Sequence, residues 1–248
     1  MTIRRGMALA TAVLVLMAAS SVQAITLDLT TAGSSGTING ALFYQADPQP
    51  TGTGVINSFL RIQMKGTEQG YNTDGKLEFD QKAGNFTRSL LLSDVPVVTI
   101  NGVQYREFGL DINEKKKGPD SLLSLDRLQF WLGAEPDLDD YSQGLGDLVW
   151  DMDAAGDSYV KMDYALNHGS GSGDIFVYVP NAVFTSTNEY VYLFSRFGDH
   201  FSSDAGFEEW WVREGKGTPP PVIPEPATLS LIGLGLGSLG LARRKRRA

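Results

Sequence analysis

The sequence predicts an all-β fold: a single β-sandwich or jelly-roll-like domain over residues 25–217, followed by a C-terminal transmembrane helix. Apolar and polar residues alternate in many short runs; in SFLRIQMK, for example, Leu60, Ile62 and Met64 alternate with polar side chains. Turn-forming groups such as GSSG, TDG and GSGSG separate these runs. No helical stripe of apolar residues continues for more than about two turns. We therefore expect about nine to eleven short strands in one domain.

The expected strands can be placed in chain order from this alternation and from β-branched and aromatic content. They are 58–65, 76–81, 96–100, 103–112, 159–166, 174–180, 189–197 and 207–214. Asn101-Gly102 lies between two of them and predicts a tight hairpin, because both residues tolerate positive φ. The segment 121–132 (SLLSLDRLQFWL) is the exception, since its spacing could begin a helix.

The first 24 residues have the organisation of a secretory signal peptide. Arg4 and Arg5 precede an apolar run over 7–19, and Val22-Gln23-Ala24 gives a small-residue cleavage site. The apolar run is short for a permanent membrane span. We therefore expect residues 1–24 to be removed on export and residues 25–217 to form an extracellular domain.

The C-terminal 31 residues divide into three parts. Residues 218–226 are a proline-rich linker, 227–242 are an apolar Gly/Leu stretch, and 243–248 are a basic tail. Sixteen residues give about 24 Å of helix at about 1.5 Å per residue, less than a hydrocarbon core of about 30 Å. The stretch therefore predicts a short transmembrane helix, and the basic tail predicts a cytoplasmic end.

These tail features together resemble the PEP-CTERM sorting signal. The features are the motif Pro224, Glu225 and Pro226, the apolar stretch after it, and the basic stop Arg243, Arg244, Lys245, Arg246 and Arg247. The resemblance implies a Gram-negative bacterial protein that an exosortase, a membrane transpeptidase, cuts near the Pro-Glu-Pro motif. It also implies a transient stay in the inner membrane, then transfer to the cell surface or extracellular matrix, together with exopolysaccharide production.

The charge of the body limits its partners. Residues 25–217 contain 14 basic and 28 acidic residues, a net charge of −14. Such a domain is not expected to bind nucleic acid or anionic lipid through counterion release. The chain has no cysteine, which excludes disulfides and thiol chemistry.

One acidic loop resembles the start of a calcium-binding loop. Asp151, Asp153 and Asp157 follow the spacing of its first ligands, with Gly156 at the turn. Ala155 and Met162 stand where the fifth and twelfth ligands would be, which excludes an EF-hand. A looser Ca²⁺ site remains open, with Asp137, Asp139 and Asp140 as a second ligand source or as a solvated loop.

Two adjacent tryptophans suggest a sugar contact. Trp210 and Trp211 lie in an expected strand, so their side chains should point to opposite faces. One can enter the core, and the other could stack on a sugar ring if it is exposed. The same alternation excludes a glycosidase pair at Glu208 and Glu209, because neighbouring strand residues cannot flank one bond.

The two histidines are the candidate catalytic groups. His168 and His200 lie in Gly/Ser-rich turns near Ser170 and Ser202. No G-x-S-x-G motif and no metal-ligand spacing accompany them, so an enzyme is not expected.

Three functions are therefore compatible with the sequence. The first is a non-enzymatic surface or matrix protein associated with exopolysaccharide in a biofilm. The alternative is a calcium-dependent carbohydrate-binding module, and the third is an extracellular hydrolase.

Overall fold

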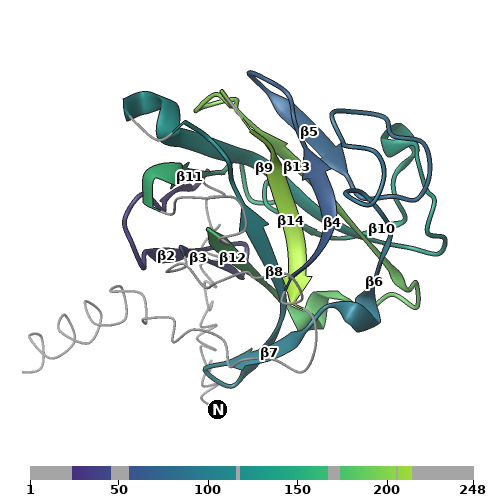
Figure 1. The fold of residues 1–248 in the computed structure, drawn as a ribbon. Helices are drawn as coiled ribbons and strands as arrows, with labels where there is room; N and C mark the ends of the chain where they lie inside the picture. The colour runs from purple at the N-terminus through teal and green to yellow at the C-terminus, as the bar shows by residue number, and fades with distance from the viewer. Residues whose placement is uncertain (1–23, 46–55, 116–117, 167–173, 205, 214–248) are drawn as a thin grey trace, which may run out of the picture.

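The computed structural model describes residues 24–45, 56–115, 118–166, 174–204 and 206–213. These residues form two seven-stranded sheets and contain no α-helix (Figure 1). The predicted all-β class is confirmed for them. The described part holds 14 strands, more than expected, because several are only two to four residues long.

Sheet A has the strand order β1-β11-β9-β13-β5, with β10 also paired to β9 and β6 to β13. Its strands are β1 (Thr26–Asp28), β5 (Glu68–Tyr71), β6 (Leu90–Leu91), β9 (Leu122–Gly133), β10 (Asp147–Asp151), β11 (Tyr159–Asp163) and β13 (Tyr190–Phe197). All pairs are antiparallel except β1 with β11.

Sheet B has the order β2-β3-β12-β8-β14-β4, with β7 also paired to β8, and all its pairs are antiparallel. Its strands are β2 (Ser35–Ile38), β3 (Ala41–Gln45), β4 (Ile56–Ile62), β7 (Val97–Ile100), β8 (Val103–Asp111), β12 (Ile175–Pro180) and β14 (Glu208–Arg213). Short 3₁₀ helices are η1 (Leu92–Asp94), η2 (Gly118–Ser121), η3 (Tyr141–Gln143), η4 (Tyr164–Leu166) and η5 (Asn181–Val183).

The two sheets lie face to face across one apolar core. Phe108 of sheet B packs on Phe130 of sheet A with 4.6 Å between ring centroids. The indole Nε1–H of Trp210, from sheet B, donates to Ser195 Oγ of sheet A at 3.0 Å. In β12, for example, the alternate residues Ile175, Val177 and Val179 enter this core, as the period-two alternation predicts.

The outer face of each sheet carries a smaller aromatic cluster. On sheet B the buried members are Tyr44, Phe176, Tyr178 and Trp211. On sheet A they are Tyr71, Leu145, Tyr192 and Phe194. Long strands such as β12 are therefore buried on both faces, which explains their nearly continuous apolar sequence.

The predicted hairpin at Asn101-Gly102 is confirmed. It joins β7 and β8, and both turn residues have positive φ, 49° for Asn101 and 81° for Gly102. This hairpin lies at the lower end of the molecule in Figure 1.

Two local expectations were wrong. The possible helix at 121–132 is strand β9, which pairs along most of its length with β13. The expected strand at 76–81 does not form, apart from a single bridge between Gln81 and Ile62. There, the backbone N–H of Phe79 donates to Gln81 Oε1 while the Phe79 ring packs on the outer aromatic cluster of sheet A.

Gly109, in the middle of β8, tests the packing of the outer cluster on sheet B. A Cβ at this position would lie 2.1 Å from the Trp211 ring. We expect Gly109→Ala to lower the free energy of unfolding by about 1–3 kcal/mol, because the large ring must move. Urea unfolding measures this loss.

Gly36→Ala is the matched control, since its Cβ would meet the flexible end of Leu27. We expect this control to lose less than about 1 kcal/mol. Equal stability of Gly109→Ala and the wild type would contradict the tight contact.

Both ends of the chain lie outside the described residues. These include nearly all of the predicted signal peptide and the whole of the predicted linker, membrane helix and basic tail. Within the described residues, no helix is long and apolar enough to cross a membrane. The segment assignments at the two ends remain predictions.

Candidate functional site

The acidic loop after β10 uses two of its three predicted calcium ligands in internal hydrogen bonds. Asp151 Oδ2 accepts from Gln129 Nε2 at 2.7 Å, and its Oδ1 accepts from the backbone N–H of Asp153 at 2.9 Å. Asp153 Oδ1 accepts from the backbone N–H of Ser158 at 3.0 Å. Asp157 is exposed. The carboxylates of Asp151 and Asp153 therefore stabilise the loop itself.

The surroundings of Asp153 in this loop shift the pKa of its carboxyl group. Burial raises the pKa of Asp153, and the neighbouring charges of Asp151 and Asp157 raise it further. In the part of the chain that the structure describes, no group of three or more His, Cys, Asp or Glu side chains is arranged to hold a metal ion. The calcium site at Asp151, Asp153 and Asp157 stays a prediction without support from this geometry.

The second predicted ligand source also forms internal bonds. Asp139 Oδ2 accepts from the backbone N–H of Lys76 at 3.1 Å, while Asp140 Oδ1 accepts from the backbone N–H and hydroxyl of Ser142. The hydrogen bond from the Ser142 hydroxyl lowers the pKa of Asp140. Asp137 is exposed.

Trp210 and Trp211 point to opposite faces of sheet B, as predicted. Trp210 is fully buried in the core, and Trp211 is 2% exposed on the outer face, where its ring contacts Phe176 edge-on with centroids 5.5 Å apart. Neither indole offers an exposed face for stacking on a sugar ring. The possible sugar contact at these residues therefore has no support in this structure.

His200 is part of an arrangement that its sequence context did not reveal. Its Nδ1 lies 2.7 Å from Asp126 Oδ1, and its ring stacks on Tyr159 with centroids 3.9 Å apart and planes 13° apart. The Asp126 side chain is 5% exposed, whereas that of His200 is 43% exposed. The pair thus joins a buried carboxylate to an imidazole at the surface.

A bulge in β9 places this carboxylate. Arg196 pairs with Arg127, but the next residue, Phe197, pairs with Leu125, so Asp126 is the extra residue. Asp126 Oδ2 accepts from the Ser124 hydroxyl at 2.8 Å and from the backbone N–H of Asp199 at 2.7 Å. Asp126 therefore anchors the turn that carries His200.

The chemistry of the pair is that of an oriented imidazole. When Nδ1–H donates to Asp126, Nε2 is left as an acceptor that could serve as a base. Among the described residues, no serine hydroxyl bonds the His200 ring, and Ser202 is exposed. His168 and Ser170 lie outside the described residues. Sequence reasoning missed Asp126 because it is 74 positions from His200, and a bulge leaves no clear signal in the sequence.

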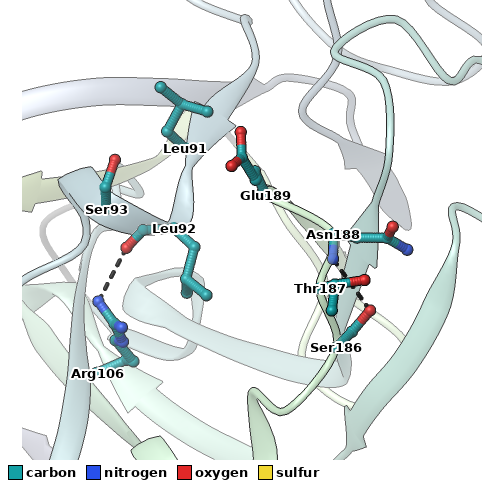
Figure 2. Close-up of a pocket in the computed structure, with 8 residues that line it drawn as sticks. All are labelled: Leu91, Leu92, Ser93, Arg106, Ser186, Thr187, Asn188 and Glu189. Atoms are coloured by element: carbon teal, nitrogen blue, oxygen red, sulfur yellow. Dashed lines mark hydrogen bonds between the residues drawn. The ribbon is translucent and has the colours of Figure 1, made fainter.

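A separate pocket of about 340 Å³ lies between η1 and the loop that precedes β13 (Figure 2). Arg106 forms one wall, where its Nη1 donates to the carbonyls of Leu92 and Val95 and its Nε donates to Asn181. Burial lowers the pKa of Arg106. Across the pocket, Figure 2 shows Glu189 and Thr187. The pocket could admit a small polar ligand, but it lacks an aromatic platform.

The C-terminal tail supplies the evidence on the class of protein. In this chain a β domain is followed by a proline motif, an apolar stretch and a basic stop. This order is the organisation of a substrate of a sorting enzyme. Residues 222–247 match the family model of the PEP-CTERM protein-sorting motif, and this match includes Pro224–Pro226 and all five basic residues. The predicted resemblance is confirmed, and the chain carries this motif.

The match supports processing by an exosortase, a membrane-associated enzyme, and export toward the cell surface. Comparison with curated proteins and with solved structures gave no match. The motif therefore bears on the destination of the protein, while the two-sheet domain has to be interpreted from its own residues.

Proposed function

We propose that this chain is a non-enzymatic protein of the cell surface or extracellular matrix, delivered by its sorting motif and associated with exopolysaccharide in a biofilm. The observation that carries the proposal is the PEP-CTERM motif at 222–247. The motif follows a two-sheet domain with an excess of acidic residues, which suits a hydrated matrix outside the cell.

The contacts of the candidate residues favour a structural role over ligand binding or catalysis. Most of the chemically suggestive side chains, Asp151, Asp153, Trp210 and Trp211, are engaged in internal contacts. His200 has a carboxylate partner, and the nearby Ser124 hydroxyl donates to that same carboxylate rather than to the His200 ring. The calcium-dependent carbohydrate-binding alternative draws less support from the same contacts.

The sorting step can be tested by substituting Pro224, Glu225 and Pro226 with alanine. We expect the variant to remain in the membrane fraction with Ala248 still attached, because the exosortase no longer recognises its site. Intact-mass analysis of protein recovered from the native envelope and medium measures this, and the wild type should end near the motif.

Alanine at Pro219, Pro220 and Pro221 is the matched control, because these prolines lie in the same linker but outside residues 222–247. The control should be processed like the wild type. A wild-type mass that retains Ala248 would overturn the sorting part of the proposal.

The matrix role needs a separate experiment on the processed wild-type protein. We expect it to co-sediment with the exopolysaccharide of its own cells, equally in calcium and in chelator. Binding that requires calcium would favour the carbohydrate-binding module instead. Turnover of a glycan or ester substrate that is lost in His200→Ala would contradict the non-enzymatic role.

A further inference from the structure

Two glutamates from opposite sheets meet inside the protein at one end of the core. Glu68 is the first residue of β5 in sheet A, where it pairs with Phe197. Glu208 is the first residue of β14 in sheet B, where it pairs with Ile62. Both side chains are fully buried. A charged carboxylate in such a place is costly unless it is neutralised or well bonded.

Strand alternation explains why both glutamates face inward. On β14, Glu208 shares the inner face with Trp210 and Val212, which belong to the core. On β5, Glu68 lies on the opposite face from Tyr71, whose ring belongs to the outer cluster of sheet A. The two carboxyl groups therefore enter the layer between the sheets from opposite sides.

Few donors reach these carboxyl groups. Glu68 Oε2 accepts from the backbone N–H of Met64 at 2.6 Å. Glu68 Oε1 and both carboxyl oxygens of Glu208 are buried without a hydrogen-bond donor of good geometry. The Glu68 carboxyl group is in hydrogen-bond contact with that of Glu208, and the backbone N–H of Asn113 and the charge of Glu114 also act on Glu208. Two ionised carboxylates cannot donate to each other, so this contact requires a proton.

The surrounding charges do not neutralise the pair. Glu114 is the third acidic group on this side, and its Oε2 accepts from the backbone N–H of Asp204 at 2.9 Å. Lys115, which follows Glu114 in the sequence, is exposed and pairs with Asp120 and Asp204, and Lys65, near Glu68, is exposed. Arg61 pairs with Glu209 on the outer face of sheet B. No described lysine or arginine forms an ion pair with Glu68 or Glu208.

We propose that Glu68 and Glu208 share one proton. The resulting carboxyl–carboxylate hydrogen bond links the two sheets, and this link weakens as the pH rises. The absence of a described group of three metal-ligating side chains and the direct contact between the carboxyl groups favour a proton over a metal ion.

The direction of the pH effect follows from the titration of Glu208. Burial raises the pKa of Glu208 well above its ordinary value, and the adjacent Glu68 and Glu114 raise it further. A group whose pKa is higher in the folded than in the unfolded protein contributes stability at low pH. That contribution is lost as the pH rises through the folded-state pKa.

Glu208→Gln tests the proposal, because the amide keeps a donor toward Glu68 at every pH. Thermal unfolding of the processed protein is followed from pH 5 to pH 9 in the presence of chelator. We expect the wild-type Tm to fall by several degrees relative to that of the variant as the pH rises. Glu209→Gln is the matched control, since it alters the neighbouring residue on the outer face and should keep the wild-type pH dependence.

Two results would overturn the proposal. One is a Glu208→Gln variant whose Tm falls with pH as steeply as that of the wild type. The other is a wild-type Tm at pH 8 that millimolar calcium raises, with no such rise in the variant, because the carboxyl groups would then hold an ion. If Glu208→Gln does not fold, Glu68→Gln serves the same purpose. In addition, the infrared carbonyl band of a protonated carboxyl group should persist in the wild type at pH 7, and its absence would refute the shared proton.

Discussion

Replacing Trp210 with alanine is expected to lower the free energy of unfolding by about 3–5 kcal/mol. Trp210 is fully buried between the sheets and is the largest of the fully buried side chains. Its removal leaves a cavity that the surrounding strands cannot easily fill. It also removes the hydrogen bond from the indole N–H to Ser195 Oγ, which links the two sheets. Urea unfolding followed by circular dichroism measures the loss.

Two further variants divide this loss into its parts. Trp210→Phe keeps most of the apolar volume but loses the donor, and we expect it to cost about 1–3 kcal/mol. Ser195→Ala keeps the ring but leaves the indole N–H without its acceptor, and a similar cost is expected. If the free energy of unfolding of Trp210→Ala lies within about 1 kcal/mol of the wild-type value, the Trp210 ring does not stabilise the core as the structure indicates.

Replacing Asp126 with alanine is the second substitution with a large expected effect, a loss of about 2–3 kcal/mol. The buried carboxylate accepts hydrogen bonds from the Ser124 hydroxyl, the backbone N–H of Asp199 and the His200 ring. Alanine would leave the backbone N–H of Asp199 without this acceptor, remove the acceptor that the Ser124 hydroxyl now uses at 2.8 Å, and free the turn that follows β13. Urea unfolding gives the stability change, and hydrogen exchange at Asp199 reports the loosening of the turn.

His200→Ala is the control for this substitution. It removes only the partly exposed ring and its contact with Tyr159, so we expect a loss of less than about 1 kcal/mol. If His200→Ala cost as much as Asp126→Ala, the contact between His200 and Asp126 rather than the anchored turn would explain the role of Asp126.

The strands could be predicted from the sequence where the alternation between their two faces was sufficient. Alternation located the segments that became β4, β8, β11, β12, β13 and β14, because most of these strands place alternate side chains in the core. The alternation in 76–81 was equally clear but did not produce a strand. There, Phe79 packs on an outer aromatic cluster that no local pattern reveals.

The ambiguity at 121–132 shows why local spacing was insufficient. The apolar spacing of this segment changes phase at the bulge, so Leu125 and Leu128 both face the core although they are three residues apart. A spacing of three is also that of a helix. Only the pairing of β9 with β13, β10 and β11 makes the segment a strand.

The candidate sites depended even more on long-range contacts. Asp151, Asp153 and Asp157 have a suggestive spacing, but the structure turns the first two toward the amides of Gln129, Asp153 and Ser158. Trp211 was a candidate for exposure because it faces away from the core, yet a second aromatic cluster on sheet B buries it.

The sequence by itself determined the all-β class, the hairpin at Asn101-Gly102, the opposite orientation of Trp210 and Trp211, and the sorting motif at 222–247. Each of these depends on neighbouring residues, through backbone preferences, the period of two, or a short contiguous motif. The tertiary structure alone decided the Asp126–His200 pair and the meeting of Glu68 with Glu208. Those contacts join residues that are 74 and 140 positions apart, and only the pairing and stacking of the two sheets bring such residues together.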